Sequence, residues 1–222
     1  MSERKGRRAC RKRAACPGAG LGWIAANIVG YAVAVAIWVR WSQPIWPPLS
    51  QFLGGSLTLA LHGATLGMGV GVAQALALGR RSARPWLWIV ATTLAFTVSF
   101  VVASWVGLLV MRAFPPGSDK YLSNSTINIA FGLLVGGGIG VARWFVLRDS
   151  AAAAGWIFVS AVCFMVGYGA TVGIFQLTPP IEQTTLGALF GACIGAITAP
   201  LEWVWFSRRP QAWAEVTALS VA

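Results

Sequence analysis

The sequence predicts an all-α integral membrane protein whose six transmembrane helices form three repeated two-helix units, with both termini in the cytoplasm. Three observations predict this fold class: long apolar segments, basic residues gathered in alternate loops, and a glycine pattern that occurs three times. Of the 222 residues, 57% are hydrophobic and only 10% are charged, whereas an ordinary soluble domain has about 25% charged residues. This composition excludes an ordinary soluble domain.

Six largely apolar segments are each long enough to cross a hydrocarbon core of about 30 Å. They are residues 19–39, 52–78, 86–111, 125–147, 154–176 and 184–206. Together they predict one transmembrane domain over residues 19–206. Residues 1–18 are too charged to be buried, so we expect a disordered basic cytoplasmic tail. Residues 207–222 are expected to form a short cytoplasmic or interfacial C-terminal segment.

Basic residues mark alternate loops of this predicted topology. Seven of them precede the first span, and the loops expected on the same side carry most of the others: Arg80, Arg81, Arg84, Arg148, Arg208 and Arg209. The positive-inside rule therefore places both termini in the cytoplasm, as for a protein of the bacterial cytoplasmic membrane. The tail has no aromatic residues among its charges, so we expect it to attract anionic lipid headgroups and not nucleic acid.

A glycine repeated every fourth residue forms a stripe without side chains on one face of a helix. The sequence has three such stripes: Gly63, Gly67 and Gly71; Gly132, Gly136 and Gly140; Gly187, Gly191 and Gly195. In lipid the helix persists despite the glycines because its backbone groups have no other partners. The stripes are therefore predicted to be surfaces on which another helix packs closely.

A second pattern, Trp-Ile at the start of an apolar run, alternates with the glycine stripes along the chain. It occurs at Trp23, Trp88 and Trp156. Alternation on this scale predicts an internally repeated architecture. We expect Trp23 to lie near the membrane interface, where indole rings are enriched, and the prolines in residues 41–48 to stop the helix between the first two spans.

Taken together, these patterns resemble a group of uncharacterised polytopic bacterial membrane proteins built from helical hairpins. In that group the position three residues after the last glycine is often Gln followed by Trp. Gln74 keeps the Gln and Trp144 keeps the Trp, whereas the third copy departs most, with Thr198, an interrupting Pro200 and then Glu202. The resemblance implies membrane residence and a helical hairpin repeat, and it implies no activity.

Few polar residues fall inside the predicted spans. Gln74, Arg143 and Thr198 each stand three residues after a stripe, and Arg143 and Glu202 are the two charges placed inside spans. One hypothesis is an intramembrane polar cluster of these four residues near the cytoplasmic face, either a structural clasp or the inner end of a binding site. The other is that the two charged side chains extend to the headgroups. His62 is a weaker candidate, for which packing is favoured over ligation of a metal.

The sequence shows no carboxylate pair, phosphate loop or metal-ligand cluster, so we expect neither catalysis nor a cofactor or metal. The prediction is a non-enzymatic scaffold or accessory subunit of a membrane complex. The alternative is a small-solute transporter or channel, or the membrane substrate-binding subunit of an importer. Expected partners are the lipid bilayer, other membrane proteins or further copies of the chain.

Overall fold

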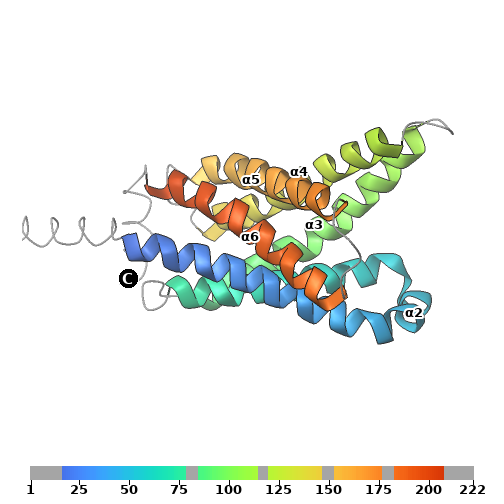
Figure 1. The fold of residues 1–222 in the computed structure, drawn as a ribbon, viewed down its shortest axis with the longest axis horizontal. Coiled ribbons are helices and arrows are strands. Elements are labelled where there is room, and N and C mark those ends of the chain that lie inside the picture. The colour runs from blue at the N-terminus through green and yellow to red at the C-terminus, as the bar shows by residue number, and fades with distance from the viewer. Residues whose placement is uncertain (1–16, 79–84, 115–119, 147–152, 177–182, 208–222) are drawn as a thin grey trace, which may run out of the picture.

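The computed structural model describes residues 17–78, 85–114, 120–146, 153–176 and 183–207, and nearly all of them are helical (Figure 1). The helices are α2 (Pro17–Leu78), α3 (Pro85–Ala113), α4 (Lys120–Val146), α5 (Ala153–Gln176) and α6 (Gln183–Ser207). The description of side chains leaves out, among others, those of residues 42–54 and 201–207. The predicted tail and C-terminal segment lie outside the described residues, apart from their innermost positions.

Helix α2 contains two spans, Leu21–Trp41 and Gly55–Ala77. The chain reverses direction between them (Figure 1), and the spans pack together: a Cβ at Gly30 would lie 2.8 Å from the Ala73 Cβ. The predicted stop at the prolines is wrong, since the backbone is helical throughout 42–54. Proline fixes φ near its helical value and removes only one donor, so it bends a helix without abolishing the local turns.

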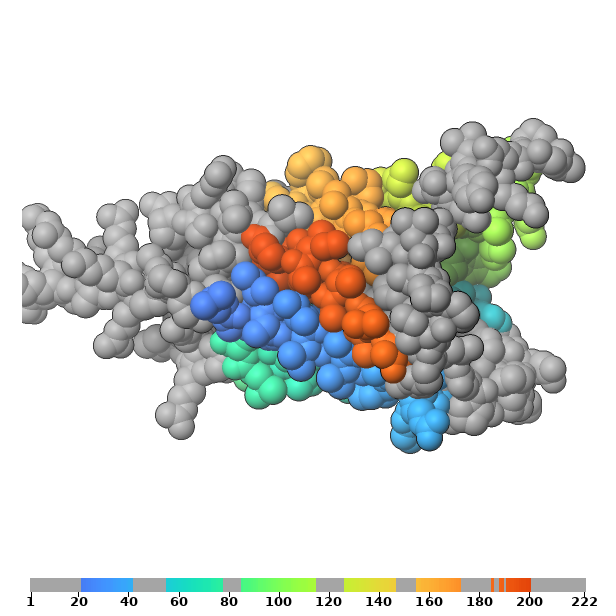
Figure 2. Space-filling view, in the orientation of Figure 1, coloured from blue at the N-terminus to red at the C-terminus, as the bar shows by residue number. Residues whose placement is uncertain are grey.

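The spans form a closed ring in chain order. The second span of α2 contacts α3, followed by α4, α5 and α6, and α6 returns to contact the first span. Figure 2 shows α6 and the first span side by side on one face. Neighbouring spans run in opposite directions, so α3 and α5 begin at the end of the bundle where α4 and α6 finish (Figure 1).

In the part of the chain that the structure describes, five helical stretches are long and apolar enough to cross a membrane. In α6, where fewer side chains are described, the apolar stretch is shorter than in the other spans and covers Gly191–Pro200. On α3, Trp86 and Trp105 are both more than half exposed. They are 19 residues apart, or about 28 Å along a helix, which matches a hydrocarbon core of about 30 Å bordered by two aromatic belts. The five stretches are those of a membrane protein.

The interior of the bundle is filled by aromatic side chains. Tyr31, Phe96 and Phe164, from the first span, α3 and α5, form a triangle with ring centroids 6.0, 6.2 and 6.1 Å apart. All three rings are buried, and Val70 and Val135 pack in the same core. Ring pairs at these separations contribute about 0.5–1.5 kcal/mol beyond the area they bury. This set, the aromatic triangle, closes the centre of the ring.

Glycines lie at three close helix contacts. A Cβ would lie 2.7 Å from the Thr93 Cα if added at Gly67, 2.8 Å from the Ala161 Cα at Gly136, and 2.7 Å from the Ile28 Cα at Gly195. Real Cβ atoms essentially never lie so close to backbone. The second span therefore touches α3, α4 touches α5, and α6 touches the first span almost backbone to backbone.

Candidate functional site

A polar layer crosses the bundle near the end at which α3 and α5 begin. It consists of Asn27, Gln74, Arg143 and Ser160 together with Trp23, Trp88 and Trp156, all of them buried. Three of the side chains form a continuous chain of hydrogen bonds. The Trp88 indole N–H donates to Gln74 Oε1 at 2.9 Å, Gln74 Nε2 donates to Asn27 Oδ1 at 2.8 Å, and Asn27 Nδ2 donates to the Trp23 carbonyl at 2.9 Å.

Gln74 is thus held from two sides by α3 and by the first span. Its side chain is 0% exposed, and both ends of its amide are paired. A buried amide without partners would cost several kcal/mol, so the two bonds are what allow a glutamine at this depth. Gln74 therefore joins three spans of the ring.

Arg143, in the last turn of α4, is the charged member of the polar layer. It is 3% exposed, and one terminal nitrogen donates to Ser160 Oγ on α5 at 3.2 Å. Its guanidinium carbon lies 5.1 Å from the centroid of the Trp156 ring and 5.9 Å from that of Trp23. Within such distances a cation is attracted by the face of an indole ring. The side chain is directed inward, so the hypothesis that it extends to the lipid headgroups is wrong for Arg143.

The glycine contacts set the register of α6. In each interface a glycine meets residues four and five positions after a buried tryptophan: Gly67 meets Thr92 and Thr93 after Trp88, Gly136 meets Ser160 and Ala161 after Trp156, and Gly195 meets Asn27 and Ile28 after Trp23. Gly195 therefore corresponds to Gly67 and Gly136. The sequence alignment of Gly195 with Gly71 and Gly140 is wrong by one turn.

The corrected register changes the members expected in the polar layer. Thr198 falls one turn away from the level of Gln74 and Arg143, and its hydroxyl donates to the Ile194 carbonyl of its own helix at 2.8 Å. Its methyl group lies against Gly167 of α5. Residue 202 takes the corresponding level instead. The Glu202 side chain lies outside the described residues, and the surroundings of Gly187 are likewise not described.

The tryptophans of the repeated Trp-Ile pattern lie inside the bundle. Trp23 is 2% exposed and packs edge to face on Trp88, with ring centroids 6.1 Å apart. The Trp23 side chain therefore faces the interior of the bundle and not lipid, and its predicted depth near the membrane interface stays a prediction. It stands on the face opposite the lipid, where Asn27 and Arg143 provide polar neighbours. Trp86, two residues before Trp88, takes the exposed position.

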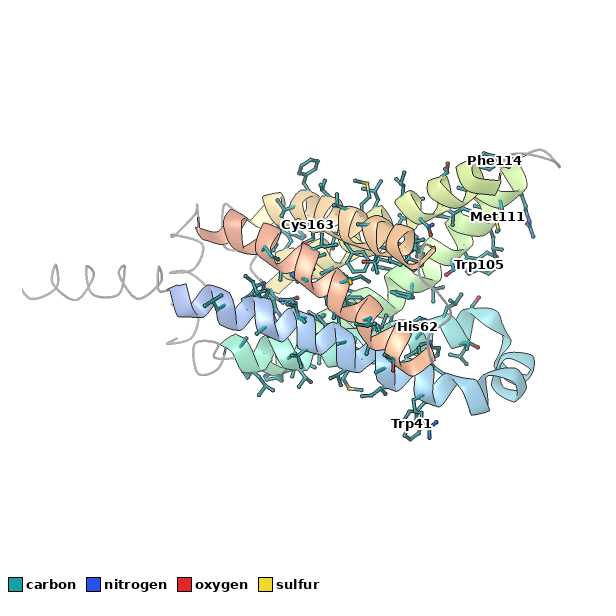
Figure 3. All side chains as sticks on the ribbon, in the orientation of Figure 1. Trp41, His62, Trp105, Met111, Phe114 and Cys163 are labelled. Carbon is teal, nitrogen blue, oxygen red and sulfur yellow. The ribbon has the colours of Figure 1, made fainter. Side chains whose placement is uncertain are left out.

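His62 lies in an aromatic cluster outside the polar layer (Figure 3). Its ring is stacked on Trp38 with centroids 4.3 Å apart and planes 4° from parallel, and it lies 4.9 Å from Phe100. In the described part of the chain no three His, Cys, Asp or Glu side chains are grouped as metal ligands. The geometry around His62 is that of aromatic packing. Trp41, Met111 and Phe114 lie toward the end of the bundle away from the polar layer (Figure 3).

Sequence reasoning missed five members of the polar layer: Asn27, Ser160, Trp23, Trp88 and Trp156. A signal for them exists: the fourth residue after each repeated tryptophan is Asn27, Thr92 or Ser160, and all three are buried. The eighth residue after each tryptophan is Tyr31, Phe96 or Phe164, the aromatic triangle. A search aligned on tryptophan would have found both layers.

The fold and the layers of its interior define a polytopic, all-helical membrane protein. Among the described side chains, the polar layer offers hydrogen-bond donors, acceptors and the buried cation of Arg143. Comparisons of the chain with protein-family models, with curated proteins and with solved structures found no match.

Proposed function

We propose that the protein is a non-enzymatic membrane scaffold or accessory subunit of a membrane complex. The observation that carries this proposal is the aromatic triangle of Tyr31, Phe96 and Phe164, which occupies the axis on which a channel would need a path. A hydrated path needs polar lining or a gate that can open. Three mutually packed rings from three different helices support a rigid bundle instead.

The outer surface supports the same proposal. Every span presents large apolar side chains outward, among them Val29, Leu76, Leu94, Leu133 and Phe158. Such faces suit lipid chains and the helices of other membrane proteins equally, because association in lipid depends on packing and not on hydrophobic exclusion. A chain whose interior is full and whose outer faces are apolar is equipped to bind partners laterally.

We infer further that the six spans are three repeated two-helix units. Support comes from the constant spacing between each buried tryptophan and the residues that the next glycine stripe meets. In this arrangement the stripes are packing surfaces, α6 is the sixth span, and both termini are on the cytoplasmic side of a bacterial membrane. The distribution of basic residues supports that orientation and a contact of the basic tail with anionic lipids.

A second candidate function, transport of a small solute or capture of a substrate for an importer, is favoured by the polar layer. Arg143 is a buried cation, and intramembrane ionisable residues often mark substrate pathways. The two candidates differ in what they require of the aromatic triangle. Transport requires it to open, whereas a scaffold requires it to stay closed.

The test is reconstitution into liposomes loaded with small ions and metabolites, beside purification from native membranes in mild detergent. We expect no flux through the wild-type protein and a stoichiometric association with a larger complex. Phe96→Ala should create a leak or destabilise the bundle, while Phe158→Ala, at a lipid-exposed position of α5, should do neither. Saturable solute flux through the wild-type protein would reject the scaffold in favour of transport.

A further inference from the structure

We propose that His62 is a proton-sensitive joint of the bundle: its neutral ring holds the first span, the second span and α3 together, and protonation loosens them. The joint is distinct from the polar layer, because His62 stands twelve residues before Gln74, or about 18 Å along the same helix. The proposal does not depend on a scaffold or transport role, since a bundle of either kind could contain such a joint.

The first step is that His62 occupies the position that Phe131 holds in α4. Each of the two residues directly precedes the first glycine of its stripe. A Cβ added at that glycine would lie 2.8 Å from the Thr97 Cα in the second span and 2.6 Å from the Met165 Cα in α4. Thr97 and Met165 are each the ninth residue after the buried tryptophan of their helix, so the two positions have the same register.

The ring contacts at the two positions also correspond. The His62 ring lies 4.9 Å from the ring of Phe100 on α3, and the Phe131 ring lies 5.0 Å from the ring of Tyr168 on α5. Phe100 and Tyr168 are each the twelfth residue after the buried tryptophan of their helix. The same site therefore holds an apolar phenyl ring in one repeat and a titratable imidazole in another.

The second step is the nature of the contacts around His62. Its ring is stacked on Trp38 of the first span, with centroids 4.3 Å apart and planes 4° from parallel. A neutral imidazole packs against these rings as another aromatic ring would. In the imidazolium both ring nitrogens are donors that require acceptors. Ring faces attract a cation, but they replace only part of the hydration that a charge loses inside a span.

The third step is depth. The second span begins at Gly55, and His62 stands seven residues later, or about 10 Å along the helix. The ring therefore belongs to the part of the span that crosses the hydrocarbon core. Protonation at this depth costs more than it would in water, so acid favours arrangements in which the ring leaves its site.

The charged groups on the packed helices do not reverse this direction. The second span, Gly55–Ala77, has no Asp, Glu, Lys or Arg. The first span carries Arg40 and α3 carries Arg112, both at exposed positions, and neither cation favours a further positive charge. Tyr168, the titratable member of the aromatic cluster on α5, is reached from His62 through two intervening rings.

The consequence is a bundle whose two ends respond differently to acid. Protonation of His62 weakens the contacts that join three spans around Trp38 and Phe100. The guanidinium of Arg143 keeps its charge over the same pH range, so the polar layer keeps its contacts. Acid therefore loosens the end of the bundle that contains His62 and leaves the polar layer closed.

The test compares the wild type with His62→Phe and with Phe131→His. Apparent Tm is measured in one mild detergent at several values between about pH 8 and pH 5, the range in which histidine takes up its proton. The Tm of the wild type should fall toward acid by roughly 3–8 °C more than that of His62→Phe. Phe131→His places a second imidazole at the corresponding site and should fall more than the wild type. Contributions of the other titratable groups are common to the three proteins and cancel in the comparison.

An equal fall of Tm in the wild type and in His62→Phe would overturn the joint, and so would a Phe131→His variant without added pH dependence. A His62→Phe variant that does not fold at about pH 8 would show that the site does not accept a phenyl ring, which also overturns the proposal. Solute flux through the wild-type protein would reject the scaffold proposal and leave this result unaffected.

Discussion

Two adjacent glycines of α4 provide a controlled test of close helix packing. A Cβ added at Gly136 would lie 2.7 Å from the Phe164 Cβ and 2.8 Å from the Ala161 Cα, and it would also meet the Ser160 carbonyl. A Cβ added at Gly137 would meet nothing within 4 Å. The substitutions Gly136→Ala and Gly137→Ala therefore add the same methyl group at nearly the same depth, one into backbone and one into open space.

The expected difference follows from these distances. Ordinary contacts of a Cβ begin at 3.4 Å, so α4 and α5 would have to separate by at least roughly 0.7 Å, which forfeits about a quarter or more of the dispersion energy along the contact. Overpacking of this kind costs about 1–3 kcal/mol. Both variants gain up to about 1 kcal/mol in helix propensity. That gain cancels in the comparison and leaves about 1–3 kcal/mol between them.

The measurement is the apparent Tm of each purified variant in the same mild detergent, followed by tryptophan fluorescence or by loss of the monodisperse peak. For a chain of this size the difference corresponds to roughly 2–12 °C, with Gly136→Ala the less stable. Gly136→Leu should be worse still and lower the folded yield. Equal Tm values for the two alanine variants would refute the close approach of α4 and α5.

Other predictions address topology and the polar layer. Reporter fusions after Ala222 and near Gly117 should report the inside and the outside of the membrane, respectively, and an external C-terminus would reverse the proposed orientation. Gln74→Leu should destabilise the bundle by roughly 2–6 kcal/mol in a denaturation assay, because it leaves buried groups of Asn27 and Trp88 without their partner. Trp88→Phe removes the N–H donor and part of a buried ring, and the unpaired Gln74 oxygen alone should cost about 1–3 kcal/mol; a Gln74→Leu variant as stable as the wild type would contradict the shared network.

Helical class and helix positions were predictable because they depend on local composition. An apolar run in lipid has to pair its own backbone groups, so length and polarity suffice to locate it. The involvement of Gln74 and Arg143 in a buried layer was also foreseeable, since polar groups inside spans tend to turn inward. The backbone contacts at Gly67 and Gly136 are those of close packing surfaces.

The register of α6 was not predictable from glycine alone. Gly187, Gly191 and Gly195 continue the four-residue spacing, and nothing in that spacing marks where the close contact begins. Ala199, which is fully buried, takes the place that Gly71 and Gly140 hold in the other two helices. Alanine is small enough for such contacts, so a pattern restricted to glycine shifts the whole helix by one turn.

The partners of the polar layer were hidden for a different reason. Asn27 and Ser160 lie in apolar runs as single small polar residues, which are common in spans and carry little information singly. Their meaning depends on which helix stands opposite, and that is a property of the closed ring. The burial of Trp23 had the same origin, because a tryptophan near the end of a span suits either the lipid interface or a polar interior.

The contact of α6 with the first span has a consequence for biosynthesis. Tyr31 and Gly191, whose backbones meet there, are separated by 160 residues. At the usual synthesis rate of about 5–20 residues per second, the first span waits roughly 8–30 s for its partner. During that interval the face of the first span at Ile28 and Tyr31, which α6 later covers, stays exposed. In a nascent chain that ends before α6, the uncovered helix face would therefore lie on the first span. Membrane proteases that degrade incomplete proteins would meet this exposed face near the N-terminus.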